Sequence, residues 1–157
     1  MAVEALQEQR TGSVWCVDVA DEAATISLAA DIASLVKAGD LVTLSGELGT
    51  GKTTFARALI RNLVGDPELE VPSPTFTLLQ VYDSAVKDGA QFPIVHADLF
   101  RIKEPSELAE LGWEEAADGA LVIVEWPERA GDGLAGDRLD IAFHAAPDGS
   151  PEARAVA

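Results

Sequence analysis

The pattern of apolar and polar positions changes between two periods along the chain. Apolar and polar residues alternate over residues 13–20, and mostly apolar runs fill residues 40–46 and 120–128, which predicts three strands, the last two buried. Apolar positions recur at helical spacing over residues 21–39 and 53–65, and each segment closes on a glycine, which predicts two helices. Further predicted elements are a loop that becomes a strand (70–84), a strand (93–100), a mostly helical segment (105–118) and an edge strand (137–145).

The alternation of strands and helices indicates an α/β domain whose sheet is covered on both faces. The chain has 157 residues, enough for one domain with a real core, and we assign residues 13–145 to that domain. Residues 1–12 are predicted to form a flexible tail. Residues 146–157 are small, polar and proline-containing, so they are predicted to form a flexible tail or a linker.

The charge balance narrows the range of partners. Eleven basic residues face twenty-seven acidic ones, which gives a formal net charge of −16. Such a surface repels phosphate backbones, so we expect no autonomous binding to nucleic acid. Solubility alone would explain the same acidity equally well.

Cysteine content and apolar segments indicate a cytoplasmic protein. Cys16 is the single cysteine, so one chain can form neither a disulfide framework nor a zinc cluster. The first ten residues contain no apolar signal core. The longest apolar run, residues 120–124, is far too short to span a bilayer. We therefore expect a reducing, cytoplasmic location and no membrane association.

A glycine-rich segment, GELGTGKT, lies between a predicted buried strand and a predicted amphipathic helix. Gly46, Gly49 and Gly51 allow a tight turn that aims backbone N–H groups at phosphate oxygens. Lys52 supplies a positive charge for the β- and γ-phosphates, and the Thr53 hydroxyl is a ligand for Mg²⁺. The alternative is a glycine-rich turn with a stray lysine. The loop predicts a P-loop NTPase-like fold, a mostly parallel sheet flanked by helices with antiparallel edge strands.

Two carboxylates follow predicted strands and are candidates for the acid that a P-loop enzyme needs near its metal. Glu125 follows four apolar residues, and Asp98 follows a shorter run. Glu125 is the first choice for the metal shell, and Asp98 is the better candidate for orienting the attacking water or completing the metal site. Either acid is alternatively a solvated strand end or a helix cap. Lys52, Asp98 and Glu125 are the predicted catalytic residues.

The nucleotide is expected to be ATP with Mg²⁺. GTPases commonly read guanine with an Asn-Lys-x-Asp motif, and the only asparagine here, Asn62, is followed by Leu63. Trp126, directly after Glu125, either stacks near the nucleotide or packs at the rim of the core.

Four further segments, together with the phosphate loop, carry a resemblance to a known family. They read SPTFTL, HADLFR, ELGWEE and VIVEWPE. In this order and spacing, over about residues 14–145, the chain resembles the TsaE (YjeE) family. That resemblance implies an ATPase of tRNA threonylcarbamoyladenosine biosynthesis that works with the proteins TsaB and TsaD. It also implies ATP hydrolysis that is slow alone, is stimulated by partners and serves as a reset step.

The resemblance also implies roles for individual residues. It makes Ser73, Pro74 and Thr75 a switch-like segment near the γ-phosphate, and it puts Glu22 near the adenine. Asp98 becomes an acid needed for activity, Glu125 the metal-side acid and Trp126 its aromatic neighbour. The implied nucleotide-binding loop consists of Gly46, Glu47, Leu48, Gly49, Thr50, Gly51, Lys52, Thr53 and Thr54.

Three residues beside these motifs stay outside the predicted site. His96 is left out because a lone histidine on a strand is more often a packed core residue. Arg101 and Arg129 either pair with phosphate or neutralise a nearby acid.

Two other functions stay open at this point. A small-molecule or nucleoside P-loop kinase usually needs an arginine-rich lid. The arginines here are few and scattered, with Arg57 and Arg61 on the helix after the loop. A non-catalytic binding module, in which the nucleotide orders residues 72–77 for a partner, is the other alternative.

Overall fold

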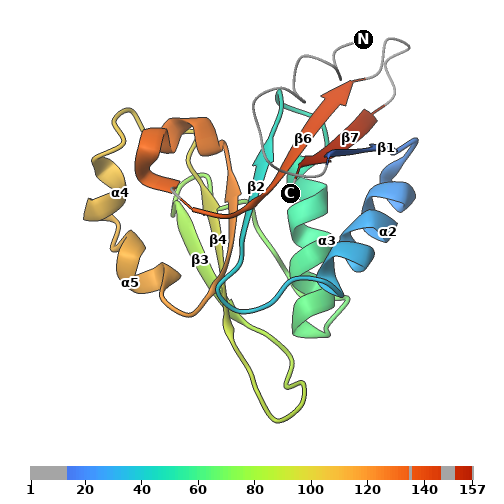
Figure 1. Ribbon diagram of the computed structural model, residues 1–157, viewed down its shortest axis with the longest axis horizontal. Helices are drawn as coiled ribbons and strands as arrows, with labels where there is room; N and C mark the ends of the chain where they lie inside the picture. The colour runs from blue at the N-terminus through green and yellow to red at the C-terminus, as the bar shows by residue number, and fades with distance from the viewer. Residues whose placement is uncertain (1–13, 135, 146–150, 157) are drawn as a thin grey trace.

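The computed structural model describes residues 14–134, 136–145 and 151–156, and the account below concerns those residues (Figure 1). The strands are β1 (Val14–Asp18), β2 (Leu41–Ser45), β3 (Leu79–Asp83), β4 (Pro93–Asp98), β5 (Leu121–Glu125), β6 (Leu139–Ala145) and β7 (Pro151–Val156). The helices are α2 (Glu22–Ala33), α3 (Lys52–Val64), α4 (Glu107–Glu110), α5 (Trp113–Ala117) and the 3₁₀ segment η1 (Pro127–Leu134).

The seven strands form one sheet in the order β1-β7-β6-β2-β5-β4-β3. The four central strands β6, β2, β5 and β4 are parallel. Strand β3 joins one side antiparallel, while β7 and β1 extend the other side antiparallel. The P-loop NTPase-like fold with a mostly parallel sheet and antiparallel edge strands is therefore confirmed.

Helices cover both faces of this sheet. Figure 1 shows α2 and α3 side by side on one face and α4 and α5 on the other. Alternate residues of β5 enter the two cores, since Leu121 and Ile123 face α2 and α3 while Val122 and Val124 face the other side. No helix within the described ranges is long and apolar enough to cross a membrane.

Two expectations at the C-terminal end of the domain are corrected. The segment predicted as a flexible tail or linker contains strand β7, which pairs with β1 on one side and β6 on the other. Strand β6 is consequently an interior strand, parallel to β2. The prediction that it is an edge strand is wrong. Residues of weak strand propensity form β7 because pairing on both sides outweighs local preference. Residues 1–12 and 146–150 lie outside the described residues.

The helix boundaries follow local capping, with two departures. The Asp21 side chain accepts a hydrogen bond from the Ala24 N–H (2.8 Å) and starts α2, which ends at Ala33 and so is shorter than predicted. Gly65 ends α3 in the left-handed conformation, as expected of a C-terminal glycine. The predicted helix over 105–118 is divided into α4 and α5 because Gly112 is also left-handed (φ 71°).

Candidate functional site

The glycine-rich loop connects β2, at the centre of the sheet, to α3. Gly46 has φ 134°, and a Cβ added to it would lie 2.4 Å from the carbonyl oxygen of Phe143. No side chain fits there, because the clash is with the backbone of β6. Gly51 caps α3 with φ 104°, a conformation that favours glycine. The sequence therefore folds this loop close against the neighbouring strand and places the N-terminus of α3 at its end.

Lys52, the first residue of α3, turns back into the loop. Its Nζ donates hydrogen bonds to the carbonyl oxygens of Gly46 (2.5 Å) and Glu47 (2.7 Å). The same ammonium lies 4.4 Å from the ring centroid of Trp126, within cation–π range. Burial lowers the pKa of Lys52 below its ordinary value, although three nearby carboxylates oppose the shift: Glu125, Glu128 and Asp98. The lysine is thus a buried cation surrounded by acceptors.

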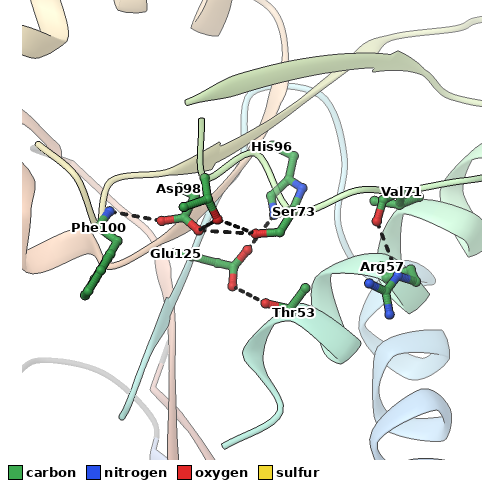
Figure 2. A network of polar contacts seen from close by, with 9 residues as sticks. Thr53, Arg57, Val71, Ser73, His96, Asp98, Phe100 and Glu125 are labelled. Carbon is green, nitrogen blue, oxygen red and sulfur yellow. Dashed lines mark hydrogen bonds and ion pairs between the residues drawn. The ribbon is translucent and has the colours of Figure 1, made fainter. Parts of the chain in front are cut away.

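Glu125, at the end of β5, is held at both carboxylate oxygens (Figure 2). Its Oε1 accepts a hydrogen bond from the Thr53 hydroxyl (2.9 Å), and its Oε2 lies 2.8 Å from Nε2 of His96. A carboxylate only accepts, so His96 donates from Nε2. Glu125 and His96 are 1% and 0% exposed, respectively. This arrangement joins α3, β4 and β5 at one point.

The oxygens of Thr53 and Glu125 are donors of the kind that Mg²⁺ prefers. Among the described residues, no group of three or more histidines, cysteines, aspartates and glutamates is arranged to hold a metal by itself. A magnesium ion with one or two protein ligands and phosphate oxygens would fit this pair.

Asp98, at the end of β4, lies directly opposite Glu125 in the parallel register. Its Oδ1 accepts a hydrogen bond from the Phe100 N–H (2.9 Å), and its Oδ2 lies 3.4 Å from the Ser73 hydroxyl (Figure 2). The Thr75 hydroxyl lies at the same distance from Oδ2. These two hydroxyls also lie 2.9 Å from each other. The predicted switch-like segment therefore contacts the strand-end acid across the mouth of the loop.

Pro74, between these hydroxyls, is buried, and its carbonyl oxygen accepts a hydrogen bond from the Leu78 N–H (2.7 Å). Leu78 has φ 65°, in the left-handed region that branched and bulky residues rarely adopt. The segment is therefore held in a turn before β3 begins.

Trp126 lies beside the phosphate loop and packs against the edge of the core on the α4–α5 side of the sheet. Its backbone is left-handed (φ 58°), and its N–H donates to the Leu44 carbonyl (3.3 Å). Its ring centroid lies 4.9 Å from that of Phe100, and the side chain is half-buried. The ring lies over Lys52 beside the phosphate loop and also at the rim of the core, so its stacking on a nucleotide stays a prediction.

Four arginines near these motifs have different roles. Arg57 and Arg61 donate from Nε to the carbonyl oxygens of Val71 (3.3 Å) and Leu69 (2.9 Å), so both tie α3 to the chain that leads into Ser73. Arg101 and Arg129 stack on phenylalanine rings, and neither makes an ion pair with a described carboxylate.

The other predicted nucleotide-binding residues line pockets on two sides of the loop. On the α2 side, Glu22 and Thr54 line two adjoining pockets of about 170 and 430 Å³. Gly49, Thr50 and Gly51 line the smaller one. On the other side, a pocket of about 630 Å³ is lined by Gly46, Glu47, Leu48, Thr50, Trp126, Glu128, Phe143, His144 and Ala145.

The sequence prediction left His96 out of the site and did not include the contact of Arg57 with Val71. A signal for His96 was present, because residues two apart on a strand face the same side and Asp98 was already a candidate. No local pattern pointed to the Arg57 contact, which depends on how the 66–72 segment returns along α3.

The fold and the site together define a P-loop NTPase-like α/β protein with two carboxylates at the mouth of its phosphate loop. The family described as "Threonylcarbamoyl adenosine biosynthesis protein TsaE" matches residues 19–154. The chain therefore belongs to the TsaE family.

Several proteins named "tRNA threonylcarbamoyladenosine biosynthesis protein TsaE" are similar to this chain. The one from Rickettsia felis is 44% identical over 69% of this chain, and the match spans 60% of that relative. The one from Bacillus subtilis is 36% identical over 82% of this chain and 76% of the relative. The crystal structure of YdiB from Bacillus subtilis superposes with a TM-score of 0.74 at 28% identity, covering 95% of this chain and 88% of YdiB.

Proposed function

We propose that this protein binds and hydrolyses ATP with Mg²⁺ as an accessory subunit in forming threonylcarbamoyladenosine on tRNA. The observation that carries the proposal is the pair of hydrogen bonds from Thr53 and His96 to Glu125 (2.9 and 2.8 Å). They fix a hydroxyl and a carboxylate beside a loop lysine, the set of groups that phosphoryl transfer to water needs. TsaB and TsaD are the proposed partners, and the proposed location is the cytoplasm.

Lys52 and the loop would provide most of the charge stabilisation. On binding ATP, Lys52 Nζ exchanges the carbonyls of Gly46 and Glu47 for oxygens of the β- and γ-phosphates. The N–H groups of the loop and of the start of α3 also bind phosphate oxygens. Thr53 and Glu125 would hold the metal ion, which neutralises charge on the phosphate oxygens when bound.

Asp98 is proposed to orient the attacking water. The water oxygen bonds to the γ-phosphorus while the bond from that phosphorus to the β,γ-bridging oxygen breaks, giving ADP and inorganic phosphate. Ser73 and Thr75, 3.4 Å from Asp98, would follow the γ-phosphate and so report the state of the nucleotide to a partner.

One observation disfavours a kinase. Arg57 and Arg61 each use Nε to hold a backbone carbonyl of the 66–72 segment, which is a structural tie and differs from the arginine-rich lid that a kinase usually needs. The nucleotide-gated module remains the second candidate, because the contact of Ser73 and Thr75 with Asp98 would support gating without turnover.

The test is the ATP turnover of the purified protein, alone and with purified TsaB and TsaD. We expect slow turnover alone, a large increase in the mixture and none without Mg²⁺. Lys52→Ala serves as the inactive control. Full pathway activity over many cycles with a non-hydrolysable ATP analogue would favour the gated module, and phosphate transfer to an added acceptor would favour a kinase.

A further inference from the structure

Two pairs of an arginine over a phenylalanine ring adjoin through the sequence neighbours Phe100 and Arg101. We call their four side chains the arginine–aromatic patch: Phe76, Phe100, Arg101 and Arg129. Phe76 is 82% exposed and Phe100 is 38% exposed. Both arginines are exposed as well. Scattered apolar residues are normal on a protein surface, but aromatic rings gathered with arginine are the residue types enriched at protein interfaces.

The two arginines are arranged for a partner that the described residues do not supply. The guanidinium carbon of Arg101 lies 4.6 Å from the ring centroid of Phe76, and that of Arg129 lies 5.7 Å from the ring of Phe100. Within the described ranges neither makes an ion pair. A guanidinium that stacks on a ring keeps its in-plane N–H donors available for a carboxylate. The patch therefore offers apolar area and forked donors together.

This composition contrasts with the chain as a whole, whose net charge is −16. We propose that the arginine–aromatic patch is the docking surface for a protein partner that presents carboxylates beside an apolar side chain. The proposal rests on the function proposed above, in which a protein partner stimulates the ATPase. Arginine and aromatic rings also bind single-stranded RNA, but the overall negative charge opposes a phosphate backbone.

The patch is continuous with the groups that would act on ATP. The ring of Phe100 lies 4.9 Å from that of Trp126, and Trp126 lies 4.4 Å from Lys52 Nζ. Phe76 directly follows Thr75, whose hydroxyl lies 3.4 Å from Asp98. A partner bound to the patch thus contacts residues adjoining both the loop lysine and the water-side acid. Partner binding and nucleotide binding should then change each other's affinity by the same factor.

The first test measures affinity for a purified TsaB–TsaD pair by biolayer interferometry. Phe76→Ser and Arg101→Glu should each weaken binding at least about tenfold, as for residues at the centre of an interface. The matched controls are Leu35→Ser, which removes a residue that is 76% exposed, and Lys87→Glu, which reverses an exposed charge. Leu35 follows the end of α2 and Lys87 lies in the turn between β3 and β4, both away from the site. The controls should stay within about twofold.

The ATP turnover of the isolated protein separates the outcomes. It should be the same in Phe76→Ser, Arg101→Glu and the wild type, because neither side chain contacts the proposed catalytic groups. Wild-type binding that both variants retain would overturn the patch and leave the proposed function standing. A wild type that neither binds the pair nor responds to it would overturn both. Loss of tRNA binding in the variants, with binding by the wild type, would reassign the patch to RNA.

A second variant tests the continuity with Lys52. Phe100→Leu keeps apolar area on the patch but removes the ring contact with Trp126. We expect binding to the pair to fall no more than about threefold, while the ratio of stimulated to unstimulated turnover falls about tenfold. An unchanged ratio would show that the partner does not act through Trp126.

Discussion

Glu125 and Asp98 are two carboxylates opposite each other on adjacent strand ends, yet their surroundings restrain them differently. Both oxygens of Glu125 are bonded at normal hydrogen-bond distances by residues of a helix and a strand, Thr53 and His96. Asp98 has one such bond, from the nearby Phe100 N–H. Among the described residues, its other oxygen contacts two loop hydroxyls, each at 3.4 Å.

The difference indicates that the Glu125 carboxylate is held in one position, whereas the Asp98 carboxylate can move. A carboxylate held by packed secondary structure is preorganised, and its position does not depend on loop motion. Asp98 shares one oxygen with Ser73 and Thr75, so its surroundings change whenever their segment moves. We therefore expect removal of Glu125 contacts to affect metal binding, and removal of Asp98 contacts to affect turnover alone.

The largest effect is expected for Glu125→Gln. The amide has almost the same shape but lacks the negative charge, so ATP turnover at saturating Mg²⁺ should fall about 100-fold or more. Thermal unfolding should show that the variant is folded. Turnover within about fivefold of the wild type would remove Glu125 from the proposed metal site.

His96 should come next, as a positioning residue for Glu125. In His96→Leu the buried Oε2 loses its donor, and the Mg²⁺ concentration for half-maximal turnover should rise about 10- to 100-fold. His96→Gln keeps an N–H near the position of Nε2 and should restore most of the metal affinity.

Calorimetric binding of Mg²⁺–ADP provides a readout for the His96 variants that is independent of turnover. A histidine that only fills the core would weaken metal binding equally in both variants, and that result would contradict the positioning role.

A smaller effect is expected on the Asp98 side. Contacts at 3.4 Å are long for hydroxyl donors, so each contributes little. Thr75→Val should lower partner-stimulated turnover about three- to tenfold at unchanged Mg²⁺ dependence, and Ser73→Ala should act alike. If Thr75→Val instead lowered ATP turnover as much as Glu125→Gln, Asp98 would depend on its neighbours as strongly as Glu125 does.

The smallest effect concerns Tyr82, which gives a reference for a buried polar atom outside the site. Its hydroxyl is buried with no hydrogen-bond partner among the described residues, and burial raises the pKa of its phenol. Tyr82→Phe should therefore change the free energy of unfolding by no more than about 1 kcal/mol, in the stabilising direction.

The sign of the pH effect follows from the raised pKa. The folded protein binds the Tyr82 proton more tightly than the unfolded chain, so this contribution to stability is complete below about pH 10 and is lost above it. Denaturant titrations at neutral and alkaline pH check this. A Tyr82→Phe protein that loses stability at high pH as steeply as the wild type would contradict it.

The sequence predicted the centre of the molecule better than its margins. Strands β2 and β5 and helix α3 have strong local signals: apolar runs, a glycine-rich turn and a terminal glycine. Strand β7 has no such signal, because it is defined by pairing with β6 and β1, which no local window contains. The interior position of β6 was missed for the same reason.

The site, like the fold, could be predicted only in part from the sequence. Glu125 and Asp98 could be predicted to share an edge of the sheet because parallel strands end together, and the structure has them in register. The distances that distinguish them could not be predicted. They depend on where His96 and the segment around Ser73 come to rest, which is a property of packing between elements distant in sequence.

The insertion of β7 between β1 and β6 has a consequence for the order of assembly. Among the described strands, β1 pairs only with β7, so Cys16 finds its neighbour at residue 154. During synthesis on a ribosome, the phosphate loop and the four parallel strands exist before β7 does. Without β7, β1 has no strand to pair with among the described strands, and the backbone groups of β6 on the side away from β2 stay unpaired. Completion of this sheet therefore depends on contacts between segments at opposite ends of the sequence, which makes it a slow, non-local step of folding.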